Sequence, residues 1–427
     1  MKYSIIVPVR NCREFVEYAI TSVLSQAGNR TDYEVLVSDN YSSDGSYEYI
    51  QTITHPCVKI LRPPSVKTMA AHYEWLLEQT QGDWITIVGS DDGVQPYFFS
   101  LADRLIELAN ERNIKIINGE RAYYFWPDCS KEYGNIQTRY AADQQYIIKS
   151  ADREFIPTLL SGEGFFSMPQ IYAGSLVHKN VVAHIKECQN GIFFRSVSPD
   201  AYASAAIASI GEQYIHSYIP LTWIGSSPKS IGGGTNRQKV NDIFDLPKDT
   251  IECAKELGED YAQIGHIAVT LFMWESMLNA SMLQSQKTQR FYRSRFTAYI
   301  ICAAIVRERR SYVLCTEEDI KMYNVEEQNF QNLMQRLGIN PIIVYIIAFV
   351  LRFYRQDFFT RAWRKLGRMC GLIPKPFRIS TDYHSATQNA NILESCKLTQ
   401  ELYDKEFADA KIHLKTKRYW REWIWGK

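Results

Sequence analysis

The sequence predicts an α/β fold, in which a mostly parallel sheet flanked by helices is followed by a mainly α-helical C-terminal region. Short β-type runs alternate with helical periodicity over the first part of the chain, a pattern typical of a doubly wound sheet. A glycine loop, Ile231 to Asn236, ends this pattern, and the remainder has helical periodicity. Two domains are therefore expected in the 427-residue chain, residues 1–235 and 236–427.

Each predicted element of the first domain rests on its own run of residues. Four apolar, β-type runs predict strands at Ser4 to Val9, Glu34 to Ser38, Val58 to Leu61 and Trp84 to Val88. Apolar residues at helical spacing predict helices at Cys12 to Gln26, Tyr47 to Ile53, Thr68 to Gln79 and Tyr97 to Asn110. Ile114 to Asn118 is predicted as a further strand.

The second domain is expected to consist of long helices. Amphipathic stretches cover Thr250 to Gln286, Arg290 to Arg310 and Glu317 to Leu337. Pro341 to Leu351 is strongly apolar, but it is shorter than the roughly 18 residues that would indicate a membrane span.

Basic and aromatic residues are interleaved over residues 352–368 and again over 415–425. Helices of this composition lie in membrane interfaces, so the inner membrane surface is an expected partner. Two alternatives stay open: helices that pack on their neighbours, with Arg and Lys stems over apolar surface, and homo-oligomerisation. On the membrane hypothesis, removing the residues after about Pro341 should release the protein without unfolding the first domain.

Composition and charge narrow the class of protein. A hydrophobic content of 46% and a charged content of 22% are globular values. The net charge of +1 argues against a general nucleic-acid-binding protein. Nine scattered cysteines without a Cys-x-x-Cys pair indicate a reducing compartment. With no recognisable leader at the N-terminus, we expect a cytoplasmic protein, peripheral on the cytoplasmic face of the membrane if the C-terminal helices bind lipid.

The stretch Gly82 to Pro96 is where we expect the chemistry. Its strand ends abruptly in Ser90, Asp91 and Asp92. Ligands of open α/β sheets bind beyond the carboxyl ends of the strands, and hard divalent cations take carboxylate oxygens together with substrate phosphates. Asp91 and Asp92 are thus candidates for a metal and diphosphate anchor; the alternative is an ordinary Asp-Asp-Gly turn.

Other candidate groups follow the neighbouring strands. Asp39 follows the second strand and could bind a base or ribose, or else serve as a helix cap or turn residue. Arg62 and Lys67 flank the third strand and could meet diphosphate charge, or else be solvated surface. Asp200 precedes a helix over Ala201 to Ile210; it could be a general base, or only a favourable partner of the helix dipole.

Several motifs of other chemistries are missing. The sequence has no Gly-x-Ser-x-Gly elbow, no His-x-x-x-His pair, no Walker A loop and no Gly-x-Gly-x-x-Gly run. Serine hydrolysis, ATP hydrolysis and hydride transfer therefore lose support, and so does a nucleotidyltransferase, which needs a glycine-rich phosphate loop near its first strand.

Three ordered pieces of the chain carry a family resemblance. They are Ser4 to Asn11, Glu34 to Ser46, and Gly82 to Pro96 with Gly-Ser-Asp-Asp-Gly at its centre. At this spacing they resemble the family 2 glycosyltransferases with a GT-A fold, over roughly residues 1 to 235.

The resemblance implies a nucleotide-sugar donor, with a UDP-sugar as first choice, a divalent metal (Mn²⁺ or Mg²⁺), and inversion at the anomeric carbon. Asp91 would bind the metal with Asp92 in support, and Asp200 would deprotonate the acceptor hydroxyl. The residues that would contact the donor are Pro8, Val9, Arg10, Asn11, Asp39, Lys67, Ser90, Asp91 and Asp92.

The chain departs from the family pattern at two positions. Gly89 stands where the family has its first acidic residue, and Pro199 stands where a glutamate precedes the base. Glu163 and Glu154 are therefore kept as alternative bases. No Gln-x-x-Arg-Trp motif of processive synthases is present, so transfer of a single sugar is expected.

The predicted function is thus an inverting glycosyltransferase of surface polysaccharide synthesis with a glycan or lipid-linked glycan acceptor. The alternative is a non-catalytic scaffold of a membrane-docked glycan assembly complex.

Overall fold

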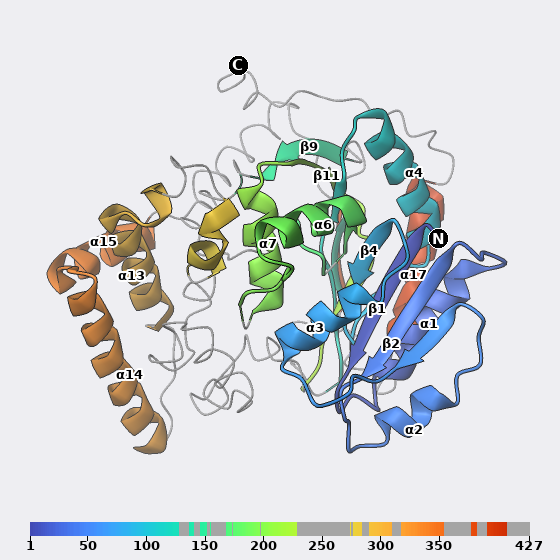
Figure 1. The fold of residues 1–427 in the computed structure, drawn as a ribbon, viewed down its shortest axis with the longest axis horizontal. Coiled ribbons are helices and arrows are strands. Elements are labelled where there is room, and N and C mark those ends of the chain that lie inside the picture. The colour runs from blue at the N-terminus through green and yellow to red at the C-terminus, as the bar shows by residue number, and fades with distance from the viewer. Residues whose placement is uncertain are drawn as a thin grey trace.

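The computed structural model of the protein confirms the α/β class and the helical C-terminal region. Figure 1 shows the sheet and its helices at one end and the helices of residues 295–353 at the other. The structure describes residues 1–127, 136–140, 146–151, 154, 168–172, 174–196, 198–228, 274, 276–283, 290–309, 317–353, 377–381 and 391–407.

The main sheet has eight strands in the order β3-β2-β1-β4-β10-β6-β11-β9. In chain order they are β1 (Tyr3–Val9), β2 (Tyr33–Asp39), β3 (Val58–Leu61), β4 (Trp84–Ile87), β6 (Ile116–Gly119), β9 (Tyr146–Ser150), β10 (Ser175–His178) and β11 (Gln213–Ser217). The first four strands in this order are parallel, β10 is antiparallel to β4 and β6, β11 is parallel to β6, and β9 is antiparallel to β11. The sheet is mixed but mostly parallel, as predicted.

Helices cover both faces of this sheet because apolar side chains alternate along its strands. Ile5 and Val7 of β1 belong to one buried cluster and Ile6 to another. The first cluster is closed by α1 (Val16–Ala27) and α4 (Phe98–Glu111), and the second by α3 (Met69–Glu78), α6 (Lys179–Cys188) and α7 (Pro199–Ser209). The short helix α2 (Ser46–Gln51) follows β2.

The strands and helices expected before residue 120 are all present, with ends that differ by a few residues. One difference concerns the candidate site. β2 continues through Asp39, which pairs with Val9 of β1, so Asp39 is the last residue of the strand rather than the first of the loop.

A second sheet of five strands was not predicted. Its order is β13-β8-β7-β12-β5, and its strands are β5 (Gly93–Val94), β7 (Ala122–Phe125), β8 (Ile136–Tyr140), β12 (Thr222–Ser226) and β13 (Phe377–Thr381). β13 pairs with β8, and the late helix α17 (Ile392–Phe407) packs on α1. Two C-terminal elements thus lie against the N-terminal part. The domain boundary at residues 235/236 lies outside the described residues and stays a prediction.

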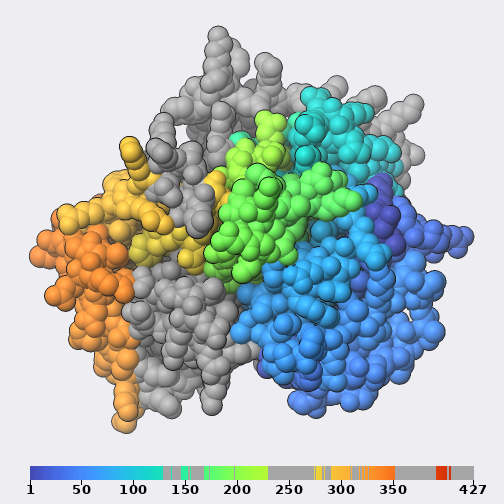
Figure 2. Space-filling view, in the orientation of Figure 1, coloured from blue at the N-terminus to red at the C-terminus, as the bar shows by residue number. Residues whose placement is uncertain are grey.

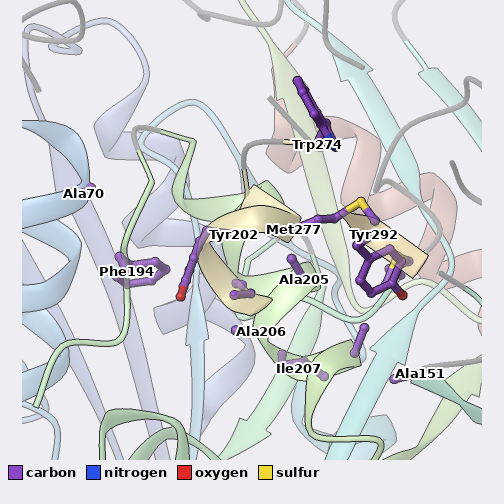
Figure 3. Close-up of a cluster of buried hydrophobic side chains, with 14 of the residues drawn as sticks. Ala70, Ala151, Phe194, Tyr202, Ala205, Ala206, Ile207, Trp274, Met277 and Tyr292 are labelled. Carbon is purple, nitrogen blue, oxygen red and sulfur yellow. The ribbon is translucent and has the colours of Figure 1, made fainter. Parts of the chain in front are cut away.

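The C-terminal region contains α13 (Arg295–Arg309), α14 (Glu317–Arg336) and α15 (Pro341–Phe353), which agree with the predicted helices. Figure 3 shows a contact between the C-terminal region and the N-terminal part of the chain. Met277 and Tyr292 lie beside Ala205, Ala206 and Ile207 of α7. Of the predicted helix Thr250 to Gln286, only residue 274 and residues 276–283 are described, and they include the short 3-10 turn η3 (Ala280–Leu283). The basic and aromatic segment beyond residue 353 and the tail at 415–425 lie outside the described residues.

Among the helices that the structure describes, none by itself has the length and apolar character of a membrane span. Residues 323–336 and 341–351 pass that test only as a pair, and they are bent by 109° relative to each other.

A candidate active site at the carboxyl edge of the main sheet

The carboxyl ends of β1 and β2 are held together by their loops. The Asn40 amide donates to the Val9 carbonyl (2.8 Å), and the Ser43 amide donates to Oδ1 of Asn11 (2.8 Å). The Asn11 amide in turn donates to the Ser42 hydroxyl. The segment Pro8 to Asn11 and the loop after Asp39 therefore form one connected edge, and their role in nucleotide binding stays a prediction.

Asp39 is buried and has partners within the protein. Its carboxylate accepts from the Ser42 amide and lies 3.2 Å from the Arg62 guanidinium. Arg62 stacks on the rings of Tyr41 and Tyr47. The turn role that sequence analysis left open for Asp39 is thus present, and Arg62 is bound to Asp39 rather than placed on open surface.

Lys67 is fixed through its backbone. The Asn40 side chain accepts from the Lys67 amide (3.0 Å) and donates to the Lys67 carbonyl (2.8 Å). Within the described part of the chain no ion pair involves its ammonium group. The charges of Lys67 and Arg10 act on the neighbouring His72: after burial, they are the next causes that lower its pKa, to about 4.

Asp92 binds three separate segments of the chain. Its Oδ2 accepts from the Tyr172 hydroxyl (2.6 Å) and the Gly89 amide (2.8 Å), and its Oδ1 accepts from the Gly225 amide (2.6 Å). Burial and then the charge of Asp91 raise the pKa of Asp92 to about 7, although these hydrogen bonds oppose the shift. Both oxygens of Asp92 are used within the protein, so its carboxylate holds the loop in place.

Asp91 is half-buried, and its side chain and carbonyl are bound by the residues that directly follow β12 and β7. The Ser227 hydroxyl donates to its Oδ2 (2.8 Å), and the Trp126 indole donates to its carbonyl (2.8 Å). A Cβ atom on Gly225 would lie 1.7 Å from that carbonyl oxygen, so only glycine allows this approach.

Gly89 leaves room for the same network. A Cβ atom at this position would lie 2.7 Å from Oδ2 of Asp92 and 2.9 Å from the Tyr172 hydroxyl. Gly89 stands where the family resemblance implies an acidic residue. Asp92 and Tyr172 fill the space next to it.

Asp200 lies in the first turn of α7, after Pro199 at the helix start. Its Oδ1 accepts from the Ser198 hydroxyl (2.8 Å) and the Ala201 amide (2.9 Å). Burial raises the pKa of Asp200 above that of an ordinary aspartate, and the hydrogen bonds and the charge of Arg121 oppose the shift.

Two tyrosines connect Asp200 with the loop after β4. The pKa of the Tyr73 hydroxyl is raised by burial and then by the charges of Asp200, Asp92 and Asp91, in that order. The pKa of Tyr172 is raised by burial and by Asp92, Tyr73 and Asp91. The Tyr172 hydroxyl contacts Asp92 directly, and Tyr73 is the residue whose pKa responds to the charges of Asp91, Asp92 and Asp200.

Sequence reasoning missed Tyr73, Tyr172, Gly225 and Ser227. Tyr73 lies within the predicted helix Thr68 to Gln79, where an apolar spacing gives no sign of a site role, and its ring packs on Phe194. The other three lie far along the chain from Asp91 and Asp92, and no local pattern marks them.

The other residues predicted for the site are Glu154, Glu163 and Ser90. Glu154 forms an ion pair with Lys149 (3.5 Å), and Glu163 lies outside the described residues. Ser90 is buried beside Asp91. In the part of the chain that the structure describes, no three His, Cys, Asp or Glu side chains are grouped as a metal site.

The N-terminal part of the chain is similar to known glycosyltransferases. Residues 4–157 match the family model described as glycosyl transferase family 2. An uncharacterized glycosyltransferase of Mycoplasma genitalium is 30% identical over 97 residues, which is 22% of this chain and 33% of that protein. The match thus spans about a third of the length of that curated relative.

Two solved structures are similar at low identity. The Staphylococcus aureus TarS fragment 1–349 in complex with UDP-GlcNAc has a TM-score of 0.43 at 12% identity, covering 80% of this chain and 93% of that chain. The mannosyltransferase PcManGT from Pyrobaculum calidifontis, in complex with GDP-Man and Mn²⁺, has a TM-score of 0.38 at 14% identity, covering 82% and 87%.

Proposed function

Since residues 4–157 match the family model described as glycosyl transferase family 2, we propose that the protein is an inverting glycosyltransferase. It would move one sugar from a nucleotide-diphosphate sugar to a hydroxyl of a glycan or lipid-linked glycan in surface polysaccharide synthesis. The observation that carries this proposal is that Asp91 and Asp92 follow β4 at the carboxyl edge where the parallel strands β1 and β2 end in Pro8 to Asn11 and Asp39. Asp91 would thus serve as a diphosphate anchor next to the proposed nucleotide edge, and Asp200 would supply the base. The cytoplasmic location expected from the sequence stays a prediction.

Asp200 is proposed as the base that deprotonates the acceptor hydroxyl. Two hydrogen bonds to Oδ1 fix its carboxylate, so Oδ2 would accept the proton. Burial makes the group a stronger base than an ordinary aspartate, because its pKa is shifted toward the working pH. The deprotonated oxygen would then attack the anomeric carbon from the side opposite the leaving diphosphate, which inverts that centre.

The donor diphosphate is proposed to lie between Asp91 and the cations Arg10 and Lys67. Asp91 suits a hard divalent ion, since Mg²⁺ and Mn²⁺ are commonly held by one or two carboxylates together with substrate phosphates. Such an ion would neutralise charge on the leaving diphosphate. Asp92 has both oxygens bound within the protein, so its task would be to keep Asp91 in position.

A donor screen tests this proposal. We expect isothermal titration calorimetry with UDP-, GDP-, dTDP- and CMP-sugars, each with and without Mn²⁺, to give one metal-dependent ligand. Asp91→Ala should lose that binding while its thermal unfolding stays cooperative. Well-folded wild-type protein that binds none of these donors at millimolar concentration would instead favour the scaffold.

The base is tested separately from the donor site. Asp200→Asn keeps the size and the polar character of the side chain but removes its basicity. We expect kcat to fall by about 10²-fold or more while the donor binds as in the wild type. A retained transfer rate would exclude Asp200 as the base, and Glu163→Gln is then the next variant to measure.

A further inference from the structure

The outer face of α15 exposes a contiguous set of large apolar side chains. We define this face by five residues with the following exposed fractions: Ile342 (70%), Ile343 (43%), Ile346 (57%), Phe349 (54%) and Val350 (57%). Their spacing places them on one side of the helix. The opposite side, with Val344 and Ala348, is buried against the core that contains α13.

Such a face needs an explanation, because soluble monomers rarely expose a large contiguous apolar surface without a function. Figure 2 shows the orange residues, which include α15, at the edge of the molecule and away from the blue N-terminal residues. α15 contains a single charged residue, Arg352, at its C-terminal end.

Positive charge lies at both ends of α15, while Glu327 of α14 accepts a hydrogen bond from Tyr345 on the flank of the helix. Residues 352–368 contain six basic residues and one acid. At the other end of the helix, the exposed Arg295 lies beside Gly338 in the turn that leads into α15. Anionic lipid headgroups complement positive charge at both ends of an apolar face, whereas a second copy of this chain would bring like charges together.

The length of α15 indicates how it would meet a bilayer. Its 13 residues extend about 20 Å, while a spanning helix needs about 20 residues. A helix with one apolar face and flanking cations lies in the interface plane, with that face among the acyl chains.

We propose that the outer face of α15 is a membrane-contact surface, which seats the protein on a bilayer rich in anionic lipids. The sequence pointed to the membrane through residues 352–368 and 415–425; the structure adds α15, whose apolar face would enter the bilayer while the basic residues bind headgroups. This proposal does not depend on the catalytic one, because it is tested without donor or acceptor.

Vesicle co-sedimentation of the full chain tests the proposal. We expect the wild type to bind vesicles of phosphatidylcholine and phosphatidylglycerol in equal parts, and to bind phosphatidylcholine vesicles less. Ile346→Asp/Phe349→Asp should weaken binding to the mixed vesicles by more than about tenfold, since two apolar side chains no longer enter the bilayer. The neutral pair Ile346→Gln/Phe349→Gln should also weaken it and guards against a folding defect in the first variant.

A matched control uses exposed apolar residues elsewhere in the same region. Ile320 (49% exposed) and Val325 (56% exposed) lie on α14, and Ile320→Asp/Val325→Asp should bind vesicles like the wild type. The proposal is overturned if the wild type binds neither vesicle, or if all variants bind equally. It is also overturned if sedimentation equilibrium shows a dimer that the α15 substitutions dissociate while vesicle binding is absent, because the face would then join two copies of this chain.

Discussion

Aspartates at the two ends of the main sheet differ in pKa because their neighbours differ. Asp92 is buried beside another carboxylate, so its pKa is high, whereas Asp103 contacts Arg30 and Lys2, which hold its pKa at about 2 against the effect of burial. An aspartate thus has an elevated pKa at one end of the sheet, and another aspartate has a depressed pKa at the other end. Only the elevated one adjoins the candidate site.

His72 should make stability depend on pH. It is buried on α3, lies 2.8 Å from the Ser38 hydroxyl, and has its pKa lowered to about 4. Its contribution to stability is fully present above the unfolded-state pKa of about 6.5 and is lost as the pH falls toward 4, because only the unfolded chain takes up the proton. The loss should approach roughly 3 kcal/mol.

Urea unfolding at pH 7 and pH 4.5 measures this effect. His72→Gln cannot titrate, so the difference in free energy of unfolding between the two pH values should be smaller than in the wild type by about 2 kcal/mol. An equal pH dependence in both proteins would mean that His72 takes up a proton in the folded state.

At the scale of elements, β12 positions the loop after β4. Gly225→Ala places a methyl group against the Asp91 carbonyl, so either the loop or the strand must move. We expect a loss of about 1 to 3 kcal/mol in the free energy of unfolding and weaker donor binding. The neighbouring substitution Ser226→Ala on the same strand should cost about half a kcal/mol or less.

Differential scanning calorimetry and donor titration of both variants check this prediction. If Gly225→Ala unfolds and binds donor like Ser226→Ala, the close approach of β12 to Asp91 does not matter for the site.

Elements with local signals could be predicted from the sequence, and those made by distant partners could not. The run Val58–Leu61 has the same bounds in the structure as in the prediction, because its apolar pattern lies within the strand itself. The second sheet joins residues more than 200 positions apart, as in the pairing of Phe377 with Tyr140, so no short pattern indicates it.

Some residues of the candidate site could likewise be predicted from the sequence, and others could not. Asp91, Asp92 and Asp200 were found because carboxylates at strand or helix ends are a local signal. The Tyr172 hydroxyl and the Gly225 amide reach Asp92 across 80 and 133 residues, and such contacts follow from the fold rather than from spacing.

At the scale of the whole molecule, the C-terminal part contributes to the core of the N-terminal part. Tyr403 of α17 is buried and stacks on Tyr97, with ring centroids 4.0 Å apart. Ile392 and Cys396 are buried in the cluster that contains Phe15 and Trp126. These contacts argue against the expectation that residues after about Pro341 can be removed without unfolding the first domain, because that removal takes α17 and β13 with it.

A chain that ends at residue 340 should therefore have an N-terminal part of lower stability, with exposed apolar surface where α17 packs. Tyr403→Ala tests this contact in the full chain and should cost about 3 kcal/mol, the loss typical of truncating a buried aromatic side chain. Tyr403→Phe keeps the ring stack and should cost far less. Thermal unfolding followed by near-ultraviolet circular dichroism measures both, and an unchanged midpoint for Tyr403→Ala would mean that α17 adds nothing to the stability of the N-terminal fold.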